Sequence, residues 1–121
     1  MQKKVLIVDD SPSQVRLIQG LLETEGYSPV GLSDPKRVEE AIAHERPSVI
    51  LLDVVMPERN GFQVCRELKG HAEFNSIPVI LVTSLDSRAD KERGIEVGAD
   101  AYLIKSNFDQ ANLLDTIAQL I

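Results

Sequence analysis

Three short segments that are apolar at every position limit the possible folds of this chain more than any other feature. They are residues 5–8, 49–52 and 79–82, and most of their side chains are Val or Ile. A strand with one face in water alternates apolar and polar residues, whereas a continuous apolar run is typical of a strand covered on both faces. The three segments therefore predict a parallel sheet with helices on both sides.

Segments with a helical spacing of apolar residues lie between the predicted strands. The complete strand prediction is residues 4–8, 27–32, 48–52, 78–82 and 101–104. The predicted buried stripes of the helices are Val15, Ile18 and Leu22; Val38, Ala41 and Ile42; Phe62, Cys65 and Leu68; Ala89, Ile95 and Val97; and Leu113, Leu114, Ile117 and Leu120. A strand followed by a helix, repeated five times, predicts an α/β fold with right-handed crossovers.

Two of the helices carry further signals. Asp34 and Pro35 predict the start of the second helix, because Asp caps helices and Pro favours the first helical position. The fourth helix, residues 87–97, has the thinnest apolar stripe, and Gly94 in its interior costs about 1 kcal/mol relative to Ala. Two interpretations of this helix stay open: a solvated surface element, or a part that moves.

Length and composition predict one globular domain over residues 1–121. The chain has 121 residues, of which 43% are hydrophobic and 26% charged, and it contains a single Cys, which excludes an internal disulfide or a zinc site with several Cys ligands. No apolar run approaches the roughly 20 residues of a membrane span, and the first run is too short for a signal peptide. We therefore expect a cytoplasmic protein. The net charge of −6 disfavours a nucleic-acid-binding surface.

Residues that ionise or form hydrogen bonds stand at the carboxyl ends of the predicted strands. Asp9 and Asp10 follow the first strand, Asp53 the third, Thr83 the fourth and Lys105 the fifth. In doubly wound sheets these ends converge on the crevice where ligands bind. Three carboxylates in one crevice repel one another unless a cation lies between them, and such hard oxygen ligands favour Mg²⁺ or Mn²⁺.

The same residues could bind and transfer a phosphoryl group. One carboxylate can act as the nucleophile and form an acyl phosphate, while a metal ion and Lys105 offset the charge of the phosphoryl oxygens and Thr83 donates a hydrogen bond to one of them. A simpler alternative exists for each Asp, since a single Asp at a strand end is commonly a turn or cap residue. Asp10, for example, could cap the helix that follows Ser11 and Pro12.

Four motifs, in this order and at these spacings, resemble the receiver domain of two-component response regulators, the family of the chemotaxis regulators. The motifs are residues 8–11, residues 52–57 followed by Asn60 and Gly61, residues 78–84, and residues 98–105. The resemblance covers the whole chain. It implies a flavodoxin-like (βα)5 fold with a doubly wound, five-stranded parallel sheet of order 2-1-3-4-5.

By this resemblance, Asp53 is the phospho-acceptor. Asp10, Asp53 and the backbone carbonyl of Val55 would bind Mg²⁺ directly, with Mn²⁺ as a substitute, and Asp9 would act largely through water. These assignments rest on the positions that match the family motifs.

The resemblance also implies which residues change conformation when Asp53 is phosphorylated. Lys105 would bridge Asp53 and the phosphoryl group, while Thr83 and Tyr102 would change position as the switch. The change would reach the surface formed by the fourth helix, the fifth strand and the fifth helix.

The implied function is that of a phosphorelay signalling receiver and not of a turnover enzyme. Its phosphoryl donor would be the phosphohistidine of a histidine kinase or of a phosphotransfer protein. Its output would be a downstream protein or its own output domain, without direct contact to nucleic acid or membrane. The expected state is a monomer, or a dimer that forms on phosphorylation through the fourth helix, fifth strand and fifth helix.

The sequence departs from the family pattern after Lys105. Ser106 stands where the family usually has Pro after a cis peptide bond, and a cis bond before another residue costs about 3–4 kcal/mol. The Lys105–Ser106 bond is therefore either a strained cis bond or part of a different, trans path. Residues 105–110 resemble receiver domains fused to the C-terminus of chemotaxis-type histidine kinases. Because the sequence ends at Ile121, directly after the fifth helix, we expect no output domain in this chain.

Two other functions stay open at this point. A small Mg²⁺-dependent phosphatase with an Asp nucleophile usually has a second Asp just beyond the nucleophile, where this chain has Val54 and Val55. A flavodoxin-like cofactor carrier needs a phosphate-binding loop rich in Ser, Thr and Gly after the first strand. Asp9 and Asp10 would repel a phosphate at that place.

Overall fold

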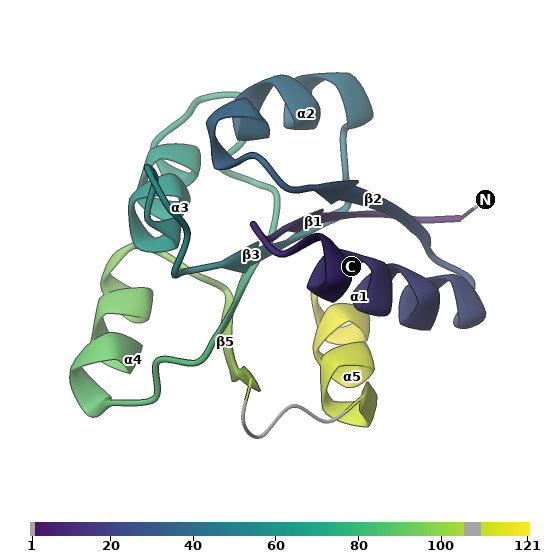
Figure 1. Cartoon of the computed structure of the whole chain (residues 1–121). Coiled ribbons are helices and arrows are strands. Elements are labelled where there is room, and N and C mark those ends of the chain that lie inside the picture. The colour runs from purple at the N-terminus through teal and green to yellow at the C-terminus, as the bar shows by residue number, and fades with distance from the viewer. Residues whose placement is uncertain (1, 106–109) are drawn as a thin grey trace.

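The computed structural model describes residues 2–105 and 110–121, in which helices cover both faces of a parallel sheet (Figure 1). The strands are β1 (Lys4–Val8), β2 (Ser28–Leu32), β3 (Val49–Asp53), β4 (Val79–Thr83) and β5 (Ala101–Ile104). The helices are α1 (Pro12–Thr24), the short 3₁₀ helix η1 (Pro35–Arg37), α2 (Val38–Glu45), α3 (Gly61–Lys69), α4 (Arg88–Glu96) and α5 (Gln110–Leu120). The strand order is β2-β1-β3-β4-β5, and each neighbouring pair is parallel, so the predicted fold is confirmed.

The sheet separates two apolar layers, which explains the continuous apolar runs in the sequence. Within β1, Leu6 and Val8 pack into the layer beneath α2 and α3, while Val5 and Ile7 pack into the layer beneath α1 and α5. All four side chains are buried. Each central strand thus contributes alternate apolar residues to two dry surfaces, and the buried polar residues Asp53 and Thr83 stand only at the carboxyl ends of β3 and β4.

Side-chain caps set the beginnings of three helices. The hydroxyl of Ser11 accepts a hydrogen bond from the backbone N–H of Gln14 at the start of α1, and Ser87 and Asn60 cap α4 and α3 in the same manner. At the predicted start of the second helix, the carboxylate of Asp34 does accept a hydrogen bond from the N–H of Lys36, but the turn that it caps is the 3₁₀ helix η1 and the α-helix begins only at Val38. The prediction therefore placed the start of α2 one short turn too early.

Helix α4 differs from its predicted form in the residues that it buries. Ala89 and Ile95 of the predicted stripe are exposed, while Val97 is buried just beyond the helix end. Within Arg88–Glu96, all of which the structure describes, only Gly94 is buried. A Cβ atom at this position would lie 2.7 Å from Cδ2 of Tyr102, so the glycine makes room for the tyrosine ring. The predicted stripe is therefore right at Val97 and wrong at Ala89 and Ile95, and Tyr102 packs against the backbone of α4 at Gly94.

Candidate functional site

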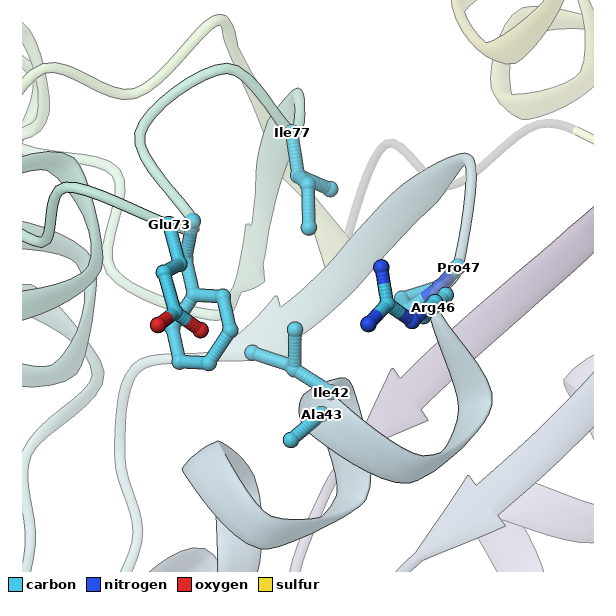
Figure 2. Close-up of a pocket in the computed structure, with 7 residues that line it drawn as sticks. Ile42, Ala43, Arg46, Pro47, Glu73 and Ile77 are labelled. Carbon is cyan, nitrogen blue, oxygen red and sulfur yellow. The ribbon is translucent and has the colours of Figure 1, made fainter.

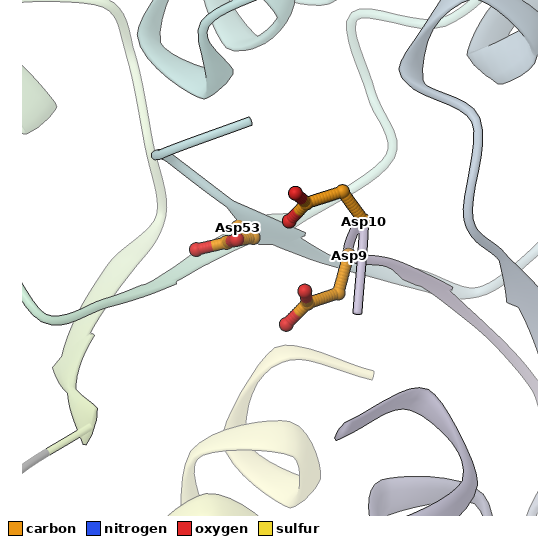
Figure 3. Close-up of side chains that lie close together, drawn as sticks. All are labelled: Asp9, Asp10 and Asp53. Atoms are coloured by element: carbon orange, nitrogen blue, oxygen red, sulfur yellow. The ribbon is translucent and has the colours of Figure 1, made fainter. Parts of the chain in front are cut away.

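Three carboxylates meet at the carboxyl edge of the sheet (Figure 3). Asp9 and Asp10 directly follow β1, and Asp53 is the last residue of β3, the strand next to β1. One carboxylate oxygen from each residue lies within 4.8 Å of those of the other two. Asp9 and Asp53 are only 4% and 6% exposed, whereas Asp10 is exposed. The neighbouring parallel strands thus bring together the acidic residues that the sequence analysis selected.

Lys105 brings a positive charge to this cluster from the end of β5, on the other side of β4 from β3. It follows β5, and its Nζ atom lies 3.2 Å from Oδ2 of Asp9 and 3.3 Å from Oδ1 of Asp53. Burial lowers the pKa of the Lys105 ammonium, but the charges of Asp53 and Asp9 and their hydrogen bonds outweigh this effect and raise the pKa overall. The ammonium therefore stays charged at neutral pH.

The pKa of Asp53 is raised to about 6, first by burial and then by the negative charge of Asp9, with Lys105 acting in the opposite direction. Three carboxylates thus face one ammonium, and the cluster has excess negative charge. A hard divalent cation would offset that charge, and the donor set of carboxylate oxygens fits the preference of Mg²⁺. The residues present are therefore suited to a magnesium ion.

Asp10 does not cap the helix that follows it, so that alternative is wrong. Ser11 is the cap residue of α1, and its Oγ atom accepts a hydrogen bond of 3.4 Å from the N–H of Gln14. The N–H of Ser11 in turn donates to Oδ1 of Asp9 over 3.0 Å. Asp9 is thus fixed by the turn, while the carboxylate of Asp10 lies beside Asp53 (Figure 3).

Thr83 and Tyr102, the two predicted switch residues, both form hydrogen bonds with the backbone of Leu85. Thr83 ends β4 and is fully buried, and its Oγ1 atom accepts a hydrogen bond of 3.2 Å from the N–H of Leu85. The hydroxyl of Tyr102 donates to the carbonyl of the same Leu85 over 2.7 Å. Leu85 could not be predicted as a linker from the sequence, because both hydrogen bonds involve its backbone and not its side chain.

Residues 54–60, which we call the β3–α3 loop, close back onto the end of β3. The N–H of Gly61 donates to the carbonyl of Val54 over 2.8 Å. A Cβ atom at position 61 would lie 2.2 Å from the carbonyl oxygen of Asp53, so only glycine allows this approach. Val54 is buried, and the side chain of Val55 is 56% exposed. The loop that contains Val55, the predicted backbone ligand, is therefore held close to the end of β3 at Gly61.

One residue near the site was missed by the sequence analysis. Arg59, in the β3–α3 loop, donates hydrogen bonds to both carboxylate oxygens of Glu39, to Glu67 and to the carbonyl of Pro35. Its side chain is only 14% exposed. The nearest charged partner in the sequence is 8 residues away and Glu39 is 20 residues away, so no local pattern could have indicated the cluster.

A pocket lies at the opposite edge of the sheet and takes no part in this cluster. Its lining consists of Ile42, Ala43, Arg46, Pro47, Glu73, Phe74 and Ile77, at the amino ends of β3 and β4. Figure 2 shows Arg46 and Glu73 on opposite sides of the pocket, with the two isoleucines between them.

One departure from the family pattern is not tested by the structure. Ser106 lies outside the described residues, so the geometry of the Lys105–Ser106 bond stays a prediction.

A family model described as the response regulator receiver domain matches residues 5–118 of the chain. The match includes every strand end named above. In the part of the chain that the structure describes, no helix is long and apolar enough to cross a membrane.

Individual relatives agree with this match. The response regulator PleD of Caulobacter vibrioides is 41% identical over 105 residues, which are 87% of this chain but only 23% of PleD, so the chain spans about a quarter of that relative. Protein PilH of Pseudomonas aeruginosa is 40% identical over 114 residues, which cover 94% of this chain and 93% of PilH. The crystal structure of the signal receiver domain of a signal transduction histidine kinase from Syntrophus aciditrophicus superposes with a TM-score of 0.89 at 35% identity, covering 98% of this chain and 89% of that one.

Proposed function

Since the chain belongs to the response regulator receiver domain family, whose members are regulatory phospho-acceptor domains, we propose that it is a phosphorelay receiver phosphorylated on Asp53. The single observation that carries the proposal is that the buried carboxylate of Asp53 lies within 4.8 Å of the carboxylates of Asp9 and Asp10 and 3.3 Å from the ammonium of Lys105. This arrangement supplies a nucleophile, a cation site and a fixed positive charge at one sheet edge.

The donor is the phosphohistidine of a histidine kinase or of a phosphotransfer protein. A carboxylate oxygen of Asp53 forms the new P–O bond as the P–N bond to the imidazole breaks, and the electron pair of that bond returns to the ring nitrogen. Lys105, 3.3 Å from Asp53, offsets the charge on the phosphoryl oxygens. Water later attacks the acyl phosphate, and its hydrolysis releases inorganic phosphate and returns Asp53 to its carboxylate form.

Asp10, Asp53 and the backbone carbonyl of Val55 would hold Mg²⁺ directly, with Asp9 acting through water, and Mn²⁺ can take its place. When bound, the ion offsets negative charge on the phosphoryl oxygens. The excess of carboxylates over ammonium groups in the cluster supports this assignment.

Thr83 and Tyr102 act as the switch in this proposal. The buried hydroxyl of Thr83 ends β4 beside Asp53, so a phosphoryl group on Asp53 gives it a new hydrogen-bond acceptor. A turn of Thr83 toward that acceptor would break its bond with the N–H of Leu85, whose carbonyl binds Tyr102. The consequence is a changed surface at α4, β5 and α5, through which the protein contacts its downstream partner or pairs with a second phosphorylated copy.

A second candidate is the receiver module of a hybrid histidine kinase, whose output lies elsewhere in the kinase. The match to the receiver domain of the Syntrophus aciditrophicus kinase favours it, at 35% identity and nearly full coverage. Both candidates use the same chemistry at Asp53. In either case we propose that residues 1–121 form one cytoplasmic receiver domain that works through protein partners, without direct contact to nucleic acid or membrane.

Intact-mass spectrometry tests the phosphorylation chemistry. The protein is incubated with acetyl phosphate in Mg²⁺ or in a chelator, and the expected result is the gain of one phosphoryl group in Mg²⁺ only. Asp53→Asn should lose the gain, and Asp115→Asn, at an exposed position on α5, should keep it. Absence of any gain in the wild-type protein, together with absence of beryllofluoride binding, would contradict the proposal.

A further inference from the structure

The β3–α3 loop contains a strained turn at Pro57, Glu58 and Arg59. The N–H of Arg59 donates to the carbonyl of Pro57 over 2.7 Å, and Glu58 between them has a φ of 69°. This is the three-residue turn with a positive central φ, which is rare and strained for a residue with a side chain. Such a conformation persists only where the surrounding contacts determine it.

The contacts that determine this turn come mainly from Arg59. Its guanidinium donates to the carbonyl of Pro35 in η1 over 3.0 Å and to both oxygens of Glu39 in α2, and it also contacts Glu67 in α3. Bidentate pairs of this kind fix the orientation of the guanidinium as well as its distance. One half-buried side chain thus connects the turn to three helices.

The neighbouring ion pair contributes less to the turn. Lys36 lies 2.6 Å from Glu58, but both side chains are well exposed, at 63% and 59%. Solvent screens such a pair, whereas the Arg59 side chain is only 14% exposed. The restraint on the turn therefore depends on Arg59 more than on Lys36.

We infer that Arg59 is a positioning residue for metal binding and phosphoryl acceptance, since it holds the β3–α3 loop in the conformation that presents Val55 beside Asp53. The inference rests on the proposed function, because it assigns a task to the loop only if the cluster binds Mg²⁺. The loop directly follows Asp53 and returns through the Gly61–Val54 hydrogen bond, so relaxation of the strained turn would displace the residues between Val54 and Gly61, Val55 among them.

Direct measurement of Mg²⁺ affinity by isothermal titration calorimetry tests this inference. We expect Arg59→Gln to weaken Mg²⁺ binding about 10-fold, the lower end of the effect of removing a group that orients a metal ligand. Arg37→Gln is the matched control, because it removes an exposed arginine whose partner Glu40 is only three residues further along the chain, in α2. The control should bind Mg²⁺ as the wild type does.

Amide hydrogen exchange without metal gives a second readout. In Arg59→Gln, the N–H of Gly61 should exchange faster than in the wild-type protein, because the loop that it closes is no longer restrained. The N–H of Gly70, which donates to Arg66 at the far end of α3, should exchange at the wild-type rate. A general loss of stability would raise both rates together.

A rescue variant separates positioning from simple stabilisation. Glycine adopts a positive φ without strain, so Glu58→Gly lets the turn form without the help of Arg59. Glu58→Gly combined with Arg59→Gln should recover most of the lost Mg²⁺ affinity. If Arg59→Gln fails to fold, Glu39→Gln and Glu67→Gln, which each remove one carboxylate partner, replace it in the same titrations.

The outcomes are distinct. Weaker Mg²⁺ binding in Arg59→Gln with recovery in the double variant supports the inference. A lower melting temperature with unchanged Mg²⁺ affinity overturns it and leaves Arg59 as a structural ion pair. If the wild-type protein itself neither binds Mg²⁺ nor gains a phosphoryl group, the proposed function fails, and the inference fails with it.

Discussion

The two loops beside Asp53 are held in very different ways. The β3–α3 loop carries a close backbone approach at Gly61 and a set of charged contacts around Arg59. The segment between β4 and α4, residues 84–87, is joined to its surroundings at Leu85, whose backbone groups pair with Thr83 and Tyr102. The first loop is therefore fixed by sterics and charge, and the second by neutral hydrogen bonds that can exchange partners.

The helices that follow these loops repeat the difference. Helix α3 buries Gly61, Phe62, Val64, Cys65 and Leu68, whereas α4 buries only Gly94 among its residues, all of which the structure describes. A helix with few buried apolar side chains has a low free energy of local opening. A site that binds a ligand and also responds to it can combine a fixed part with a movable part. Here the fixed side is the β3–α3 loop with α3, and the movable side is residues 84–87 with α4. The following predictions test this difference.

The largest effect is expected on the fixed side, at Gly61. A Cβ atom there would lie 2.2 Å from the Asp53 carbonyl oxygen and 2.7 Å from Cα of Val54, and backbone atoms cannot move away cheaply. Gly61→Ala should lower the free energy of unfolding by about 3 kcal/mol or more, measured by urea denaturation. Gly20→Ala in α1 is the control, because nothing lies within 4 Å of its Cβ position and helix propensity favours Ala. An equal, small effect at both glycines would contradict the steric argument.

Truncation of one apolar side chain in each helix compares α3 and α4 directly. Leu68 is 1% exposed and Ile95 is 77% exposed. Leu68→Ala should lower the free energy of unfolding by about 3 kcal/mol, whereas Ile95→Ala should change it by less than about 0.5 kcal/mol. Thermal or urea unfolding measures both. If Ile95→Ala were as costly as Leu68→Ala, α4 would be anchored in a way that its exposure does not reveal.

Tyr102→Phe sharpens the comparison on the movable side. It removes the hydrogen bond to Leu85, which contributes about 1 kcal/mol, and should speed amide exchange in α4 while leaving α3 unchanged. Tyr27→Phe serves as the control, since Tyr27 lies in the turn before β2, away from both loops. Beryllofluoride should likewise change exchange in α4 more than in α3. Equal protection of the two helices with and without it would count against a movable α4.

The smallest effect concerns pH and the charged contacts of the fixed side. The hydrogen bond with Arg59 lowers the pKa of Glu39 below its ordinary value of 4.5, with burial opposing it. A carboxyl group whose pKa is lower in the folded state stabilises the fold above its unfolded pKa, and this contribution is lost as pH falls through the folded value. Glu39→Gln should therefore flatten the decline in stability below about pH 4.5, only slightly because the side chain is 40% exposed. Melting temperatures across pH 3–6 measure it, and a decline as steep as in the wild type would argue against the pair.

The sequence was sufficient to predict which residues meet at the carboxyl ends of the strands. Once the apolar runs predict parallel strands, Asp9 and Asp53 must end near each other, and Lys105 lies at the same sheet edge. The charged contacts of Arg59 were not predictable in this way, because they depend on how α2 and α3 lie relative to the loop. The stripe of α4 was predicted wrongly for a related reason: Ile95 has the right residue type, but Tyr102 occupies the face that a stripe would need.

The exposed surface of α4 has a consequence for how such a protein can diverge over evolutionary time. Because the packing of this helix depends on the missing side chain of Gly94, nearly every other position in it is free to change without disturbing the core. The residues to which we assign the chemistry lie elsewhere, at the ends of the strands. Gene duplicates could therefore acquire new partners through α4 while they keep the proposed reaction, and cross-talk between such duplicates would fall first at this helix.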